Sequence, residues 1–197
     1  MVYNGLMPWD IDKAINEFGF KMGPFQMSDL AGLDIGWKKG EETTNPIRDA
    51  LCELDRRGQK TNAGYYDYDE NRVPRISELT ENLIKDITGK DKIENMNSIG
   101  IIEKCIFPMV NEALLILEEG MAQRPSDIDV VWLNGYGFPK DKGGLLFWAN
   151  KLGSSKILEG LKKMKDEGLE IKISQMLEDM VKKNKNIFDT EDQKIRV

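Results

Sequence analysis

Histidine is absent from all 197 residues of this chain. Histidine is the usual proton acceptor of enzymes that work near neutral pH, because its unperturbed pKa of about 6.5 lies close to that pH. Its absence excludes a histidine general base. We therefore predict that the chain has no catalytic residue of its own.

Cysteine is also scarce, since Cys52 and Cys105 are the only two. They stand far apart in the sequence and lack the close spacing of cysteine ligands to zinc. A disulfide between them is one possibility, and two reduced, buried thiols are the interpretation that we prefer. The sequence predicts no metal site.

Long apolar runs and a surplus of positive charge are missing. No apolar stretch approaches the roughly 20 residues that a membrane-spanning helix needs, and the N-terminus lacks the basic-then-apolar order of a signal peptide. The formal net charge of −6 gives no field that would hold a nucleic-acid backbone or an anionic membrane. We expect neither a nucleic acid nor a membrane as a partner.

Targeting signals are missing as well. The last four residues, Lys194 to Val197, differ from a peroxisomal address of the Ser-Lys-Leu type. The sequence therefore predicts a bacterial cytoplasmic location and disfavours a peroxisomal one.

The sequence shows neither the period-two alternation of β-strands nor the Gly-x-Gly-x-x-Gly fingerprint of a dinucleotide site. Apolar residues recur at helical spacing instead, as Ile11, Ile15 and Phe18 do. The pattern predicts an all-α fold, with a loop over residues 59–74 and a linker over residues 88–98. We expect helices over residues 8–18, 24–37, 46–57, 77–87, 99–119, 125–134, 145–164 and 173–180.

Part of the sequence occurs twice. The set Pro8, Asp10, Ile11 and Asp12 recurs at one constant interval as Pro125, Asp127, Ile128 and Asp129. After a short insertion, Gly23, Asp29 and Gly32 are matched by Gly144, Asn150 and Gly153. A repeat of this length exceeds a solenoid unit, so we predict two tandem copies of a small helical domain, over residues 1–88 and 99–197, packed by pseudo-twofold symmetry.

Both copies resemble the all-helical C-terminal domain of 3-hydroxyacyl-CoA dehydrogenases, which occurs in tandem at the end of multifunctional fatty-acid β-oxidation proteins. In the first copy the resemblance rests on Phe18–Phe25, Asp29–Asp34 and Gly58–Tyr66. In the second copy it rests on Pro108–Ala113, Leu117–Gly120, Asp127–Trp132, Gly135–Pro139 and Gly143–Gly144. The resemblance covers most of the chain from about residue 5 to residue 165.

The resemblance also implies that this chain lacks the catalytic and cofactor-binding residues of the family. The family uses NAD, a His–Glu pair on its nucleotide-binding domain and an asparagine on the first helix of its helical domain, and none of these positions exists here. A counterpart of the helix over 99–119 is also missing before the first copy, so we expect a truncated first copy and no NAD bound by this chain alone. Apolar side chains would then be exposed, or covered by a partner, among Ile11, Ile15, Phe18 and Leu30.

In the family the Met-Gly-Pro-Phe turn lies near the cleft that faces the nucleotide domain. The resemblance therefore implies that Met22, Gly23, Pro24 and Phe25 contact the acyl chain of the substrate. The alternative is a plain helix start, in which Gly-Pro sets the turn while Met22 and Phe25 pack into the core.

Lys60 is a further candidate, because its ammonium group could reach a phosphate of coenzyme A. The alternative is a packing loop with a solvated lysine. Asn62 stands where the family usually has glycine, and asparagine tolerates the left-handed conformation that such a position needs. Asp29 and Asp34 lie about 140° apart on a helix, so we expect structural roles for them rather than a shared acid–base site.

Two functions remain open. The chain is expected to be the C-terminal portion of an NAD-dependent (3S)-3-hydroxyacyl-CoA dehydrogenase, forming the acyl-CoA-side wall and an assembly surface, and to be inactive alone. Its partners would be the acyl-CoA, reached through a missing Rossmann domain, and either further copies in a homo-oligomer or an NAD-binding chain. The alternative is a non-catalytic helical interaction or oligomerisation module that retains the fold.

Overall fold

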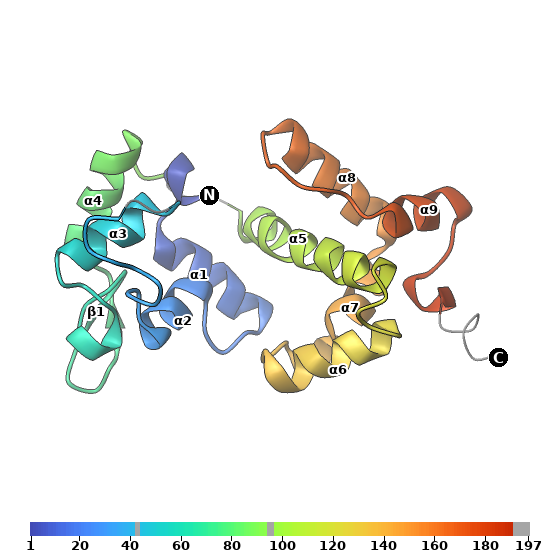
Figure 1. Cartoon of the computed structure of the whole chain (residues 1–197), viewed down its shortest axis with the longest axis horizontal. Helices are drawn as coiled ribbons and strands as arrows, with labels where there is room; N and C mark the ends of the chain where they lie inside the picture. Colours follow the sequence, from blue (N-terminus) through green and yellow to red (C-terminus); the bar gives the residue numbers. More distant parts are fainter. Residues whose placement is uncertain (42–43, 94–96, 191–197) are drawn as a thin grey trace. The chain divides into compact units, whose positions relative to one another are not determined.

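The computed structural model describes residues 1–41, 44–93 and 97–190 (Figure 1). Within these residues the regular structure is helical, apart from two strands of two residues each. The prediction of an all-α fold is confirmed. None of the helices formed by the described residues combines the length and the apolar character needed to cross a membrane.

The chain divides into two compact units. The first unit contains residues 1–17 and 21–98, and the second contains residues 18–20 and those from 99 onward. The expected pseudo-twofold packing of two copies stays a prediction. Part of the predicted linker, residues 94–96, lies outside the described residues.

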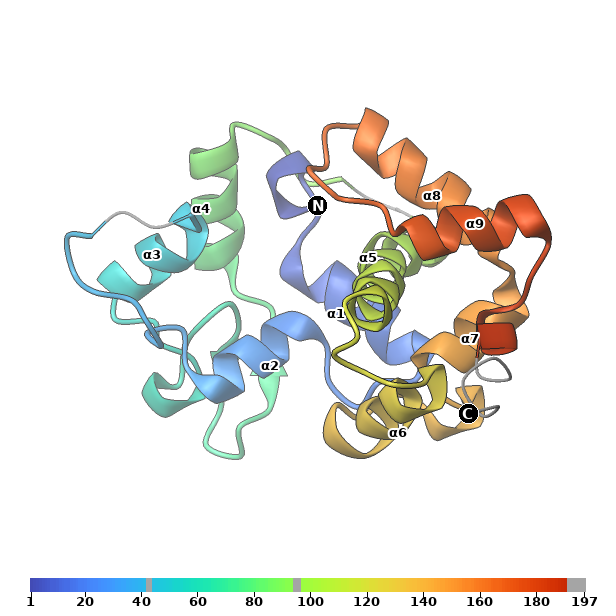
Figure 2. The same cartoon turned by 45° about the vertical axis from the view of Figure 1, so that its right-hand side comes forward.

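The first unit combines short helices with a small antiparallel ribbon. Its elements are η1 (Val2–Asn4), α1 (Pro8–Phe18, whose last residue belongs to the second unit), α2 (Pro24–Ala31), α3 (Pro46–Glu53), η2 (Gln59–Thr61), β1 (Asp67–Tyr68), β2 (Pro74–Arg75) and α4 (Glu78–Thr88). In the ribbon Asp67 pairs with Arg75 and Tyr68 pairs with Pro74. Helix α3 packs on α4, as Figure 2 shows.

Local chemistry explains where several of these helices begin. Proline at the first position of α2 and of α3 presets the helical φ without leaving an unpaired amide. The side chain of Asn45 caps α3 by accepting a hydrogen bond from the amide of Arg48. The Ser77 hydroxyl caps α4 by accepting a hydrogen bond from the amide of Thr80.

The core of the first unit brings α1, α3 and α4 together with the segment that follows η2. Its buried members are Met7, Trp9, Leu33, Ile47, Leu51, Cys52, Tyr65, Tyr66, Tyr68 and Ile84. Three of them are tyrosines, whose hydroxyl groups need hydrogen-bond partners once they are buried. Neither Cys52 nor Cys105 forms a disulfide, as predicted, but only Cys52 is buried, whereas Cys105 is partly exposed.

The second unit is built around the longest helix among the described residues, α5 (Ser98–Glu118, whose first residue belongs to the first unit), which confirms the helix expected over 99–119. The further elements are α6 (Pro125–Gly135), η3 (Lys140–Lys142), α7 (Leu145–Leu152), α8 (Ser154–Asp166), α9 (Gln175–Lys183) and η4 (Ile187–Thr190). Helix α7 packs on α6 and α8, and α9 packs on α8 (Figure 1).

Two predicted helices are shorter than expected. Helix α2 ends at Ala31 instead of continuing to residue 37, because Gly32 adopts a φ of +107° and the amide of Leu33 donates to the carbonyl of Arg57. Helix α3 ends at Glu53, and Asp55 with a φ of +60° directs the chain away. In both places a left-handed residue breaks the helix while the apolar pattern continues.

The single long helix expected over residues 145–164 is also wrong. Gly153 has a φ of +99° and separates α7 from α8. Apolar residues on both sides of Gly153 are buried, so the hydrophobic pattern continues across a break in the backbone. Glycine tolerates this conformation because it has no Cβ.

We expected four apolar side chains of the first copy to be exposed or covered by a partner, and this expectation is wrong for three of them. Ile11, Ile15 and Phe18 are only 2%, 5% and 8% exposed, whereas Leu30 is 53% exposed. Phe18 packs edge-on against the rings of Phe138 and Trp148 within the second unit. The expectation failed because periodicity shows which residues share a face and leaves open what covers that face.

Candidate functional site

The turn that precedes α2 is held by a carboxylate from α1. Gly23 is extended and has no side chain with which to cap the helix. Asp12 serves instead, and its two carboxylate oxygens accept hydrogen bonds from the amides of Phe25 and Gln26, each at 2.9 Å. A Cβ on Gly23 would overlap the Asp12 side chain, so glycine is required for this close approach.

The four predicted residues of this turn differ in exposure. Gly23 is buried, Pro24 is exposed, and Met22 and Phe25 are half-buried. The ring of Phe25 lies edge-on to the ring of Tyr65, with 4.8 Å between centroids. Met22 and Phe25 therefore keep part of their surface accessible, and Phe25 also packs against the unit.

Asp29 organises the segment that follows η2 from inside α2. It is fully buried and accepts hydrogen bonds from the amides of Tyr65 (2.9 Å) and Tyr66 (3.0 Å) and from the hydroxyl of Tyr68 (2.9 Å). The structural role expected for Asp29 is confirmed. Its partners are distant in sequence, so the pattern of residues gave no sign of them.

Glycines let this loop approach Asp29 closely. A Cβ on Gly58 would overlap the backbone carbonyl of Asp29, and a Cβ on Gly64 would overlap its carboxylate. Asn62, where the sequence suggested a left-handed residue, has a φ of +56° and is left-handed. The loop is therefore built against α2 and is not a loose surface segment.

Arg56 is a buried residue that the sequence analysis missed. Its guanidinium donates to the carbonyl of Gly64 (3.0 Å) and to the hydroxyl of Ser77 (2.9 Å), and it pairs with Asp67 at 2.7 Å. It thus connects the loop, strand β1 and the start of α4. Arginines that follow a helix usually lie on the surface, so the sequence gave no sign that Arg56 is buried. Only its tertiary contacts show that it has a structural role.

Burial controls the ionisation of this polar network. It raises the pKa of Asp12 and of Asp29, although hydrogen bonds from backbone amides and tyrosines oppose the shift. It also raises the pKa of Tyr65 to about 12, and the pKa values of Tyr66 and Tyr68 rise further still. The tyrosines are therefore protonated donors at neutral pH, which suits a structural network rather than proton transfer.

Lys60 lies at the other end of α2. It is about half exposed, forms an ion pair with Asp34, and lies beside Gly32, the residue that ends the helix. The hydrogen bond from Lys60 lowers the pKa of Asp34. A phosphate that bound Lys60 would have to compete with this carboxylate.

The outer surface of α2 connects these two parts of the candidate site. Met27 and Leu30 lie one turn apart on the helix and are both exposed, and Ile35 is exposed in the turn beyond it. We call these three residues the α2 apolar strip. The turn with Met22 and Phe25 lies at one end of α2, and Lys60 lies at the other.

The second unit repeats the contacts of the first. Asp129 in α6 accepts hydrogen bonds from the amides of Leu146 (2.7 Å) and Phe147 (3.0 Å), and a Cβ on Gly144 would overlap it. Farther along, Asn150 accepts a hydrogen bond from the amide of Ile187 (2.9 Å), as Asp29 does from Tyr65. The acceptors Asp129 and Asn150 stand at the positions that the sequence repeat aligns with Asp12 and Asp29.

The described residues do not form a metal-binding site of the usual kind. They contain no group of three or more histidine, cysteine, aspartate or glutamate side chains that could hold a metal ion. The buried carboxylates Asp12 and Asp29 are instead occupied by amides and tyrosine hydroxyls.

Comparison with protein families gives one match, "3-hydroxyacyl-CoA dehydrogenase, C-terminal domain", over residues 1–68 and 101–193. The human peroxisomal bifunctional enzyme is 40% identical over 187 residues, which cover 83% of this chain and 26% of that protein. The glyoxysomal fatty acid beta-oxidation multifunctional protein MFP-a of Brassica napus is 34% identical over 176 residues, covering 82% of this chain and 24% of that protein. The chain therefore spans about a quarter of the length of these relatives.

Two solved structures are similar to the chain. The dehydrogenase part of multifunctional enzyme 1 from C. elegans has a TM-score of 0.56 at 34% identity, covering 68% of this chain and 31% of that one. The 3-hydroxybutyryl-CoA dehydrogenase of Escherichia coli has a TM-score of 0.61 and covers 87% of this chain and 54% of that one. At 19% identity, the second likeness shows a shared fold alone.

These relatives contradict the predicted bacterial cytoplasmic location. The similar proteins named above from human and Brassica napus are peroxisomal and glyoxysomal. The prediction rested on residues 194–197, which lie outside the described residues. A targeting signal is read by a receptor and is independent of the fold, so the absence of one address could not decide the compartment.

Proposed function

The chain belongs to the family of 3-hydroxyacyl-CoA dehydrogenase C-terminal domains, and on this basis we propose that it forms the acyl-CoA-side wall of an NAD-dependent (3S)-3-hydroxyacyl-CoA dehydrogenase of fatty-acid β-oxidation. It would also provide an assembly surface. The observation that carries the proposal is the α2 apolar strip, which extends from the Met22–Phe25 turn towards Lys60.

The strip suits the acyl part of such a substrate. Met27, Leu30 and the accessible parts of Met22 and Phe25 offer apolar surface that stands in water in this chain. Each methylene group of an acyl chain that leaves water contributes about 0.8 kcal/mol. A few contacts along α2 would therefore distinguish long chains from short ones.

Lys60 suits the opposite end of the substrate. Its ammonium group lies at the end of α2, is accessible to solvent, and could attract a phosphate of coenzyme A as a point charge. The ion pair with Asp34 weakens this attraction and orients the lysine. Pro24 and Gly23 would act by shaping the turn that presents Met22 and Phe25.

NAD does not fit the described residues. A dinucleotide site needs a parallel sheet with a glycine-rich turn, and the sheet found here is one antiparallel pair of two-residue strands. The base that accepts the hydroxyl proton cannot be a histidine of this chain. The NAD site and the base would therefore lie outside the described residues. They would belong either to a longer polypeptide or to another chain in a complex or homo-oligomer.

We further propose that residues 1–88 and 99–197 are two copies of one domain. The support is the repeated contact set, in which Asp12 and Asp129 each hold the start of the next helix. Each of these hydrogen bonds joins residues more than ten positions apart in the sequence. The same contacts at aligned positions in both units therefore favour a common origin over chance.

The purified chain alone is expected to give no NADH from a 3-hydroxyacyl-CoA. A chimera in which it replaces the aligned segment of the human peroxisomal bifunctional enzyme is expected to give NADH, because that enzyme would then supply the missing parts. The measurement is the growth of NADH absorbance with 3-hydroxyacyl-CoA substrates of several chain lengths. Turnover by the chain alone, or a folded but inactive chimera, would contradict the proposal.

Within the chimera, Leu30→Asp is expected to raise KM for a long-chain substrate about tenfold with little change in kcat. A charge in place of Leu30 removes about 1–2 kcal/mol of apolar contact that the substrate would make in the ground state and in the transition state alike. The matched control is Leu79→Asp, because Leu79 lies on α4 and is similarly exposed. Equal KM values for the two variants would exclude α2 as the acyl wall.

A helical interaction module without a role in catalysis is the second candidate. The apolar side chains exposed on α6, Val130 and Val131, favour it, because uncovered apolar patches usually mark an interface. The chimera distinguishes the two, since an interaction module would leave Leu30→Asp without effect on KM.

A further inference from the structure

A shallow groove lies within the first unit, between the end of α3 and helix α4, which pack on each other (Figure 2). We call it the α3–α4 groove, and its volume is about 430 Å³. Leucine side chains form its apolar part, because Leu54 and Leu79 are 53% and 46% exposed and Leu83 is half-buried. Exposed leucines gathered in one groove are typical of a surface that a partner covers.

Carboxylates flank these leucines on α4. Glu78, Asn82 and Asp86 line the same groove and recur every four residues, so they form one row along the helix. No lysine or arginine of the described residues lines the groove. The ion pairs that α4 makes within the described residues use Lys85 and Glu81 instead. The groove is therefore apolar along its floor and negatively charged along one edge.

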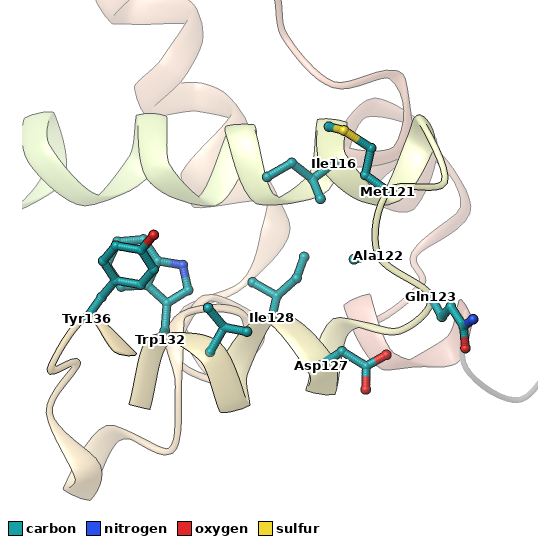
Figure 3. A pocket seen from close by; sticks show the side chains of 9 residues that line it. Ile116, Met121, Ala122, Gln123, Asp127, Ile128, Trp132 and Tyr136 are labelled. Atoms are coloured by element: carbon teal, nitrogen blue, oxygen red, sulfur yellow. The ribbon is translucent and has the colours of Figure 1, made fainter. Parts of the chain in front are cut away.

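A groove in the second unit, between α5 and α6, has a different charge. Figure 3 shows its apolar lining, which includes Ile116 and Trp132, and Asp127 at one end. Asp127 pairs with Arg124 at 2.7 Å, so its charge is compensated within the unit. Glu78 and Asp86 are not compensated in this way among the described residues, so the α3–α4 groove favours a positively charged partner.

We propose that the α3–α4 groove binds an amphipathic helix of a partner protein that carries lysine or arginine beside its apolar residues. The apolar residues of such a helix enter a groove at i, i+3 or i+4, and i+7. Two of its cations, placed about 12 Å apart, would meet Glu78 and Asp86, which are separated by two turns of α4. The leucines would supply most of the affinity, and the charges would select the partner.

A second copy of this chain fits the groove poorly. The same groove on another copy would bring carboxylates against carboxylates, which is unfavourable. Helix α8 carries several lysines, but its apolar residues, among them Leu158 and Leu161, are buried. The charges therefore favour a separate basic helix over self-association.

The test is the binding of synthetic peptides to the full chain, measured by fluorescence anisotropy. The probe is a helical peptide of about 18 residues, with leucines at i, i+3, i+4 and i+7 and lysines on both flanks, and a twin peptide has glutamates in place of the lysines. The lysine peptide is expected to bind about tenfold more tightly than its twin. Glu78→Lys combined with Asp86→Lys should reverse this order.

Matched variants control for net charge and for unspecific apolar contact. Glu159→Lys combined with Asp166→Lys changes the net charge equally, at exposed positions of α8, and should keep the order of the two peptides. Leu54→Ser should weaken binding of the lysine peptide about tenfold. Leu169→Ser, at a similarly exposed leucine of the second unit, should leave binding unchanged. Circular dichroism checks that each variant folds as the parent does.

Equal binding of the two peptides, or a reversal of their order by the α8 variant as well, would overturn the inference. Hydrogen exchange in α4 that slows as the concentration of the chain rises, without peptide, would assign the groove to a second copy and would overturn it too. The NADH assay of the chimera contains no peptide, so Leu79→Asp stays the control for substrate binding there. The proposed function and this inference can therefore fail independently.

Discussion

Replacing Asp12 with alanine is expected to lower the free energy of unfolding of the first unit by about 3–5 kcal/mol. The carboxylate is buried and accepts hydrogen bonds from the amides of Phe25 and Gln26 and from the hydroxyl of Tyr66 (2.8 Å). Alanine removes both carboxylate oxygens and with them all three hydrogen bonds. Each buried donor left unpaired costs about 1–3 kcal/mol, and water that enters the site recovers part of this loss.

Urea unfolding followed by tryptophan fluorescence measures this change, because Trp9 lies in the same core as Tyr66. Asp129→Ala should destabilise the second unit instead, by about 2–4 kcal/mol, since two amides lose their acceptor. Hydrogen exchange assigns each loss to its unit. Asp86→Ala, at an exposed position on α4, is the control, and a loss no larger than the control's would show that Asp12 does not hold α2.

Gly58→Ala is expected to destabilise the first unit by about 4 kcal/mol or more, or to prevent its folding. Gly58 has a φ of +99°, and a Cβ there would overlap the backbone carbonyl of Asp29. Rotation of a side chain cannot relieve this overlap, because the carbonyl belongs to α2 itself. The loop or the helix would have to move, and the hydrogen bonds of Tyr65 and Tyr66 to Asp29 would be lost with it.

Gly36→Ala is the matched control for this experiment. Gly36 has a similarly positive φ of +72°, but no atom lies within 4 Å of the position that its Cβ would take. Its substitution therefore measures the conformational strain alone, about 1–2 kcal/mol. Thermal unfolding by circular dichroism compares the two variants, and equal losses would show that the contact between Gly58 and Asp29 does not limit stability.

Much of the local structure could be predicted from neighbouring residues. Pro8 and the apolar spacing of Ile11 and Ile15 define α1, and Ser77 caps α4. The long helix α5 and the left-handed Asn62 were predicted as well. All of these depend on interactions within a few residues, which a sequence displays directly.

The candidate site could be predicted only in part. The residues Met22 to Phe25 and Lys60 were named from the family resemblance, and the structure places them at opposite ends of α2. The exposure of Leu30 was among the expectations, whereas the exposure of Met27 one turn away was not foreseen. The glycine that ends α2 interrupts a pattern that continues on both sides of it.

The sequence by itself determined the all-α class and the family, because helical periodicity and motif identity are properties of the order of residues. Only the tertiary structure decided what the buried polar groups do. Asp12 meets α2 across 13 residues and Tyr66 across 54, and Arg56 meets Ser77 across 21. Hydrogen bonds between residues so far apart depend on how the chain returns upon itself, and burial then fixes their partners because an unpaired polar group is unstable in the interior.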